Sequence, residues 1–157
     1  MNINDIVAWA IAKKNERKIA LLQTGDLIKI KSDYYPFVSH YGIVDIEDDG
    51  EIYILHNQPD KLNSKGGGTI REPLRKWIYG REIVEVESTG LSKEEIQSLY
   101  EGLKPFKYDF FHFNCEHFVN FAKNGAYLSP QVIRYTSIAI VGLLAFWYFK
   151  KRNNGAN

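Results

Sequence analysis

One thiol and four imidazoles are the side chains of this 157-residue sequence best suited to nucleophilic chemistry. The thiol belongs to Cys115, within residues 114–118 (NCEHF), and this segment predicts a helix that begins at Cys115 with Asn114 as its N-cap. Free backbone amides and the positive end of the helix dipole favour a thiolate at that position. A thiolate is the nucleophile that covalent acyl transfer needs, and the backbone amide of Cys115 could contribute to an oxyanion hole.

The base for such a thiol must come from the histidines, which are His40, His56, His112 and His117. His40 lies at the start of a predicted hairpin and His56 at its end, so paired strands would set the two rings side by side. One ring could then hydrogen-bond the other and fix its tautomer. His117 is a poor base, because two residues along a helix amount to a rotation of roughly 200°. In the alternative interpretation, Cys115 is a small buried hydrophobe and the histidines are packing residues.

The elements that would position these residues follow from local patterns. Residues 3–16 have apolar side chains at helical spacing, and residues 27–31, 40–46 and 52–55 are typical of strands. The Asp49-Gly50 pair predicts a hairpin turn between the last two of these strands. Residues 58–68 (QPDKLNSKGGG) predict a flexible surface loop, and residues 82–87 predict a half-buried strand.

Two helices should follow these strands. Residues 91–103 predict the first, with Ser92 and Glu95 as a capping box. The second begins at Cys115, and Gly125 lies just past its end. The order of helix, antiparallel strands and further helices predicts an α+β fold, with a strand meander packed beside helices.

The composition excludes several classes of protein. Hydrophobic residues at 45% and charged residues at 25% indicate one globular domain, not a disordered or low-complexity chain. A net charge of +1 gives no electrostatic footprint for nucleic acid. A single cysteine excludes an intramolecular disulfide and a Cys-rich zinc site, and neither CxxC nor HExxH spacing occurs, so we expect no metal and no cofactor. No secretory signal is recognisable at the N-terminus, which favours an intracellular protein.

The C-terminus carries a long apolar run. Residues 135–149 contain no charge, and basic residues flank them on both sides. A helix that begins at Ser129-Pro130 would reach Lys150 after about twenty residues, which is the length of a membrane span. Because the run is apolar on all sides, we interpret it as a membrane tail anchor. A helix buried against the domain, or one that binds a partner, is the alternative.

The segment NCEHF resembles the motif of the lecithin:retinol acyltransferase family, whose small membrane-anchored relatives are the H-rev107-type phospholipases and acyltransferases. Further landmarks follow in the same order as in that family. Residues 25–28 (GDLI) resemble its opening strand, residues 40–43 (HYGI) its histidine box, and residues 53–56 (YILH) the strand with its second histidine. The resemblance spans roughly residues 22–150, nearly the whole chain.

The resemblance implies a permuted papain-like (NlpC-type) fold. Together with the residue patterns, it divides the chain into an amphipathic helix over residues 1–18, a catalytic domain over 19–128 and a membrane-anchor helix with a basic tail over 129–157. Cys115 would be the nucleophile, His40 the general base and acid, and His56 the residue that holds the ring of His40. Asn57 is the neighbouring candidate for that third role.

The chemistry implied by the resemblance moves an acyl chain from a membrane glycerophospholipid onto Cys115 as a thioester. Water, an amine, an alcohol or a lysolipid then receives the acyl chain, which would make the protein a phospholipase A or acyltransferase. Membrane phospholipids are therefore the expected partners, and nucleic acid is not. Two alternatives remain open. One is a non-catalytic membrane or protein interaction module with the same fold, and the other is a papain-like amidase or peptidase.

Overall fold

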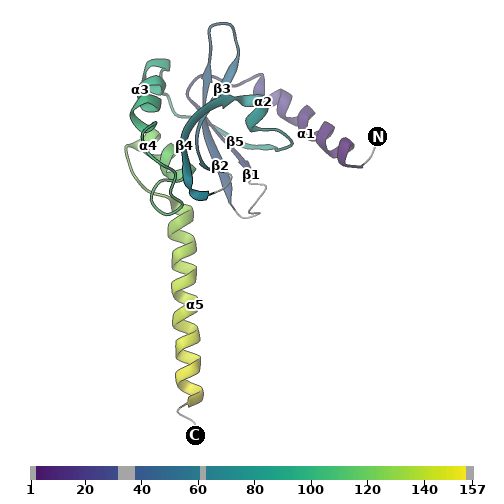
Figure 1. The fold of residues 1–157 in the computed structure, drawn as a ribbon. Coiled ribbons are helices and arrows are strands. Elements are labelled where there is room, and N and C mark those ends of the chain that lie inside the picture. Colours follow the sequence, from purple (N-terminus) through teal and green to yellow (C-terminus); the bar gives the residue numbers. More distant parts are fainter. Residues whose placement is uncertain (1–2, 32–37, 61–62, 155–157) are drawn as a thin grey trace.

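A computed structural model describes residues 3–31, 38–60 and 63–154 of the chain (Figure 1). The helices and strands in chain order are α1 (Ile3–Ile19), β1 (Asp26–Lys31), β2 (Ser39–Ile46), β3 (Ile52–Asp60), β4 (Asn63–Pro73), α2 (Leu74–Trp77), β5 (Ile83–Ser88), α3 (Lys93–Leu103), α4 (Cys115–Asn124) and α5 (Pro130–Asn154).

The strands form one antiparallel sheet in the order β4-β3-β2-β1-β5. The predicted turn between β2 and β3 is confirmed: Gly50 has a φ of 85°, and its backbone N–H donates to the carbonyl oxygen of Glu47 at 2.9 Å. A positive φ costs glycine little because glycine has no Cβ. The predicted α+β class with an antiparallel meander is therefore confirmed.

The predicted surface loop over residues 58–68 is wrong. Strand β3 continues to Asp60 and β4 begins at Asn63, with Gln58 opposite Gly68 and Pro59 opposite Gly67. The three glycines in this stretch carry no side chains, so the period of two that marks a strand cannot be recognised in the sequence. Backbone pairing with β3 defines this strand. The strand is therefore recognised from the tertiary structure and not from the pattern of side chains.

Helices cover both faces of the sheet, with α3 and α4 on one side and α1 and α2 on the other (Figure 1). Alternate residues of a strand point to opposite faces. On β2, Ile43 accordingly packs in the cluster that includes Phe118 of α4, whereas Val44 packs in the cluster that includes Trp77 of α2. On β3, Leu55 likewise packs in the cluster with Phe118, and Ile54 packs in the cluster with Trp77.

The predicted starts of α3 and α4 are confirmed by their caps. The Ser92 backbone N–H donates to the Glu95 carboxylate at 2.8 Å, and the Glu95 backbone N–H donates to the Ser92 hydroxyl at 3.2 Å. At α4, the side-chain oxygen of Asn114 accepts the backbone N–H groups of Glu116 at 2.9 Å and His117 at 3.0 Å. Such caps pair backbone donors that the first helical turn leaves free.

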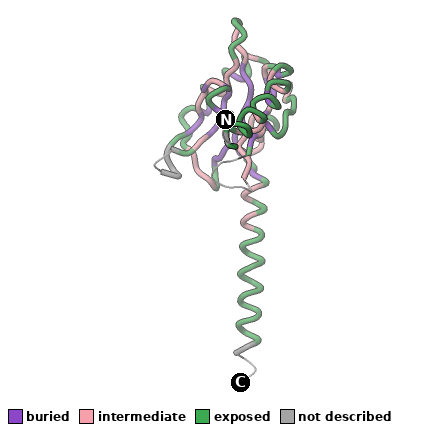
Figure 2. Tube along the Cα trace, turned by 90° about the vertical axis from the view of Figure 1, so that its right-hand side faces the viewer, coloured by how far each residue is buried: buried purple, intermediate pink, exposed green. Residues whose placement is uncertain are grey.

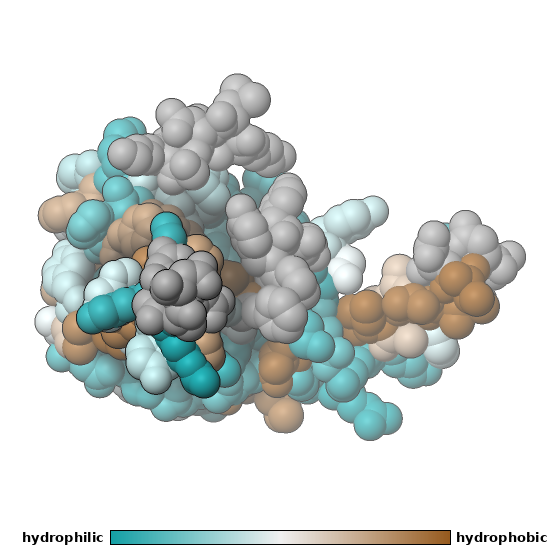
Figure 3. Space-filling model, turned by 90° about the horizontal axis from the view of Figure 1, so that it is seen from below, coloured by the Kyte–Doolittle hydropathy of each residue, from teal (hydrophilic) through white to brown (hydrophobic). Residues whose placement is uncertain are grey.

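Helix α1 is attached to the domain near its C-terminal end. The buried side chain of Asn15 donates to the carbonyl oxygen of Arg81 at 2.8 Å and accepts the backbone N–H of Ile83 at 3.0 Å. The other end of α1 projects from the domain, and Ile3, Val7 and Trp9 there are exposed. Figure 3 shows this apolar end from the side toward which α5 extends.

Helix α5 leaves the domain and extends into solvent over most of its length (Figures 1 and 2). Its first turn is attached through Glu116 of α4, whose carboxylate accepts the Ser129 hydroxyl at 2.5 Å and the backbone N–H of Gln131 at 2.8 Å. By length and composition, residues 130–152 are long and apolar enough to cross a membrane, and none of their most apolar window is buried. The alternative of a helix buried against its own domain does not fit this arrangement.

Gly42 gives a test of the packing at the centre of the sheet. A Cβ at this position would lie 2.3 Å from Cγ2 of Ile54 and 3.2 Å from the carbonyl oxygen of Leu55. We therefore expect Gly42→Ala to lower the free energy of unfolding by about 1–3 kcal/mol, as overpacking does. Urea unfolding followed by circular dichroism measures this change. The control is Gly102→Ala in α3, where the added methyl meets nothing within 4 Å. We expect the control to stabilise by about 0.5–1 kcal/mol, and equal effects of the two substitutions would contradict this account.

Candidate active site

The candidate site lies where β2 and β3 separate. Pairing between these strands covers residues 43–46 and 52–55, while residues 39–42 pair with β1 and residues 56–59 pair with β4. The N-terminus of α4 meets both strands at this point. Asn57 of β3 donates its side-chain N–H to the carbonyl oxygen of Phe113 at 2.5 Å, and the thiol of Cys115 contacts the carbonyl oxygen of Ser39 of β2 at 3.7 Å.

The Cys115 thiol is buried at the first residue of α4, as the sequence predicts for the helix start. Its charge state differs from the prediction. Burial raises the pKa of Cys115 to about 12, although the backbone N–H groups of Tyr41, Cys115 and Glu116 oppose this rise. The helix terminus does favour a thiolate, but withdrawal from water disfavours the charge more strongly. The resting side chain of Cys115 is therefore a neutral thiol.

His40 and His56 meet as predicted, because Nε2 of His40 lies 3.0 Å from Nδ1 of His56. The two rings are nearly perpendicular, with centroids 5.0 Å apart, and Trp77 of α2 packs against both at 5.4 and 5.6 Å. Burial is the main cause that lowers the pKa of each histidine, and the pKa of His40 falls well below its usual value. Both rings are therefore neutral at pH 7.

Glu72 of β4 is a member of this cluster that the sequence prediction missed. Its carboxylate lies 2.9 Å from Nε2 of His56, and its other oxygen lies 2.7 Å from Nζ of Lys76. The hydrogen bond from His56 is the main cause that holds the pKa of Glu72 at about 2. Glu72 is paired with Ile54, two residues from His56, so the contact is a diagonal one across the two strands. Only the pairing of β3 with β4 reveals this contact, and the sequence prediction had placed part of β4 in a loop.

The thiol lies beside the backbone of β2 at His40. The sulfur lies against the backbone on both sides of His40, at the carbonyl of Ser39 and the N–H of Tyr41. The His40 ring is directed toward His56 through Nε2, which leaves Nδ1 as the nitrogen available to a thiol. Within residues 3–31, 38–60 and 63–154, the hydrogen bonds of the sulfur are to backbone groups and not to an imidazole.

The remaining candidates have other contacts. Nδ1 of His117 accepts the backbone N–H of Asn114 at 3.3 Å and thereby completes the cap of α4, in keeping with its prediction as a poor base. His112 is exposed and lies 3.0 Å from the carboxylate of Asp109. Asn57, the alternative third residue, contacts the loop before Cys115 and not His40. Of the two candidates for the third residue, His56 is therefore the one that hydrogen-bonds the His40 ring.

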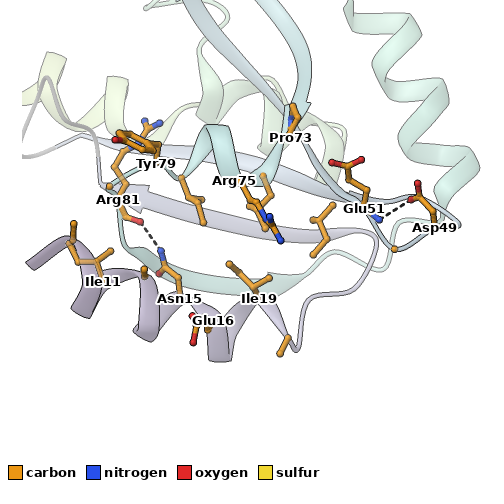
Figure 4. A pocket seen from close by; sticks show the side chains of 18 residues that line it. Ile11, Asn15, Glu16, Ile19, Asp49, Glu51, Pro73, Arg75, Tyr79 and Arg81 are labelled. Carbon is orange, nitrogen blue, oxygen red and sulfur yellow. Dashed lines mark hydrogen bonds between the residues drawn. The ribbon is translucent and has the colours of Figure 1, made fainter. Parts of the chain in front are cut away.

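Two cavities are relevant to the position of a ligand. The larger, about 1040 Å³, is bounded by α1, α2 and the β2–β3 turn, and Figure 4 shows Ile11, Ile19 and Arg75 among its lining residues. It is on the α2 side of the sheet. The smaller, about 190 Å³, has Tyr41 and Glu116 among its lining residues. The backbone of Tyr41 contacts the thiol of Cys115, and Glu116 follows Cys115 in the sequence. In the described part of the chain, no group of three or more His, Cys, Asp or Glu side chains could hold a metal ion.

A comparison of the sequence with models of protein families and with curated proteins finds no match. The chemistry of the site is therefore argued from its geometry and from the sequence motifs.

The neutral resting thiol gives a test by alkylation. At pH values far below a pKa of about 12, the thiolate fraction of Cys115 grows about tenfold per pH unit, because each pH unit lowers the proton concentration tenfold. We expect the rate of iodoacetamide addition to the folded protein to rise in this way between about pH 7 and pH 9, as followed by intact-protein mass spectrometry. The matched control is the same protein in urea, whose exposed thiol has an ordinary pKa near 8.5. A plateau below pH 8 in the folded protein would contradict a neutral resting thiol.

Proposed function

We propose that this protein is a membrane-associated cysteine acyl hydrolase or acyltransferase, with a glycerophospholipid as acyl donor. The observation that carries the proposal is the hydrogen-bonded pair of His40 and His56 beside a thiol at the N-terminus of α4. A nucleophile next to a base that a third group orients is the arrangement used in covalent acyl transfer. The resemblance of the NCEHF segment to the lecithin:retinol acyltransferase family, with its permuted papain-like fold, supports the same chemistry.

In this mechanism His40 takes the proton of Cys115, and the sulfur attacks the carbonyl carbon of the ester. The carbonyl electrons move to the oxygen, which the backbone N–H of Cys115 at the helix terminus would stabilise. When the tetrahedral intermediate collapses, the bond to the lysolipid oxygen breaks, and protonated His40 returns its proton to that oxygen. The product is an acyl thioester on Cys115. Water, an amine, an alcohol or a lysolipid activated by neutral His40 then takes the acyl group and restores the thiol.

A bilayer substrate is favoured by α5. A helix of this length and apolarity, extended into solvent from the domain, supports an anchor that holds the domain at a membrane surface. Phospholipids remain within the bilayer, so an anchored enzyme meets them by lateral diffusion. The exposed aromatic residues Trp147 and Tyr148 beside Lys150 fit the interfacial end of such a span.

A second candidate function is a non-catalytic interaction module that keeps the same fold. It is favoured by the buried, neutral thiol, whose hydrogen bonds in the described residues are to backbone groups. In that case Cys115 and the histidines serve packing, and α5 supplies the functional contact. The thioester test below separates this function from the enzymatic one.

Acyl transfer through Cys115 predicts a covalent intermediate. After incubation with phosphatidylcholine vesicles, intact-protein mass spectrometry should detect a gain of one fatty-acyl mass that hydroxylamine removes. Cys115→Ala should show no gain, and His40→Ala should slow acylation by roughly 10²–10⁴-fold, the usual contribution of a general base. The matched control is His112→Ala, because His112 is exposed and paired with Asp109 outside the cluster. Fatty-acid release that persists in Cys115→Ala would refute the mechanism.

Membrane anchoring by α5 predicts a specific sensitivity to charge. Leu143→Arg combined with Leu144→Arg should release the protein from vesicles in a flotation assay, because each arginine at the centre of a span costs about 2.5–3.5 kcal/mol. Leu21→Arg is the control, since Leu21 is also exposed but lies outside α5. Retention of the double variant on vesicles, with release of the Leu21 variant, would assign membrane binding to another surface.

A further inference from the structure

We propose that Glu72 is a positioning residue that fixes the tautomer of His40 through His56. The hydrogen bonds from Glu72 to His56 and from His56 to His40 direct the His40 proton to Nε2 and keep Nδ1 open to accept the proton of Cys115. This inference rests on the proposed function for the role of Nδ1, but the tautomer itself is a property of the resting protein and is measurable without substrate.

The first step follows from the chemistry of a carboxylate. An ionised carboxylate can only accept hydrogen bonds, so the nitrogen of His56 that faces it must carry a proton. That nitrogen is Nε2, at 2.9 Å from Glu72. Glu72 is ionised at neutral pH because its hydrogen bonds with His56 and Lys76 lower the pKa of the carboxyl. His56 is therefore the Nε2–H tautomer.

The second step transfers this constraint to His40. A neutral imidazole carries one N–H, so Nδ1 of His56 has a lone pair and acts as an acceptor. Nε2 of His40 lies 3.0 Å from that lone pair and must be the donor. Burial keeps both rings neutral, so Nδ1 of His40 then carries a lone pair as well. The buried carboxylate of Glu72 thus determines which nitrogen of His40 can act as a base, although two hydrogen bonds separate the two residues.

The reverse arrangement would block the base. If His56 carried its proton on Nδ1, it would donate to Nε2 of His40, and the proton of neutral His40 would sit on Nδ1. That nitrogen could not accept the proton of Cys115. Without an acceptor at Glu72, the two arrangements differ little in their hydrogen bonds. Trp77 packs against both rings and holds their planes, but its contacts do not distinguish one nitrogen from the other.

The charged groups around the pair are consistent with this assignment. Besides Glu72, Lys76 and Arg81 act on the electrostatics of the histidines, and both lower the pKa of His56 as positive charges. They therefore help to keep His56 neutral, which the relay requires. When His40 accepts the proton of Cys115, its Nε2–H still donates to His56, so no hydrogen bond of the relay has to break.

The test is the ¹⁵N NMR spectrum of the histidine rings, recorded at pH 7 on the full chain in detergent micelles. In the native protein, the pyrrole-type resonance should belong to Nε2 of both His40 and His56, and the pyridine-type resonance to Nδ1. Glu72→Met removes the acceptor at similar volume, and we expect it to shift His40 toward the Nδ1–H tautomer. Glu72→Asp keeps a carboxylate acceptor, and we expect it to keep more of the native Nε2–H tautomer of His40 than Glu72→Met does. Glu101→Met is the control, because Glu101 is exposed on α3.

Two outcomes would overturn the inference. One is a native His40 with its proton on Nδ1, which needs no variant and so does not depend on how a variant folds. The other is a folded Glu72→Met protein whose His40 keeps the Nε2–H tautomer. Where the Cys115 thioester forms, we also expect its rate to fall by about tenfold to a hundredfold in Glu72→Met, by analogy with the outer-shell partners that orient metal-ligating histidines. Native tautomers without a thioester would support the relay and refute only the enzymatic function.

Discussion

The separation of β2 from β3 is the constraint on which the rest of the site depends. Strands that diverge leave backbone and side-chain polar groups without ladder partners, and a buried polar group without a partner costs about 1–3 kcal/mol. Side chains from several elements meet at this point. Asn57 pairs with the loop before α4, His40 with His56, and His56 with Glu72. The cluster that could perform chemistry thus lies where the two strands separate.

Two opposing effects act on the thiol at this gap. The N-terminus of a helix stabilises an adjacent negative charge by about 0.3–1 kcal/mol, and by about 2 kcal/mol at most. Burial disfavours the thiolate by more, so the thiol of Cys115 is neutral at rest. A nucleophile of this kind needs a neutral base beside it, because a charged imidazolium has no lone pair to offer. The low pKa of buried His40 meets that requirement.

The two ends of the chain have different relations to the domain. Asn15 joins α1 to Arg81 and to Ile83 of β5. Helix α5 is attached at its first turn, where Glu116 accepts the backbone N–H of Gln131 and the Gln131 side chain accepts the backbone N–H of Ser39. Glu116 follows Cys115 directly, so the attachment of α5 and the start of α4 share one turn of backbone. A displacement of α5 would therefore act close to the thiol. The fold joins the element that would hold the protein at a bilayer to the residue that would react with its lipids.

The sequence alone determined the features whose signals are local. The cap at Asn114, the Asp49-Gly50 turn and the apolar run of α5 each depend on a few neighbouring residues, and each was predicted with nearly its observed limits. Only the tertiary structure decided the strand over residues 63–73, the partnership of Glu72 with His56 and the neutral state of Cys115. These features depend on pairing between distant segments and on exclusion of water, and neither effect leaves a periodic pattern in the residues that it acts upon.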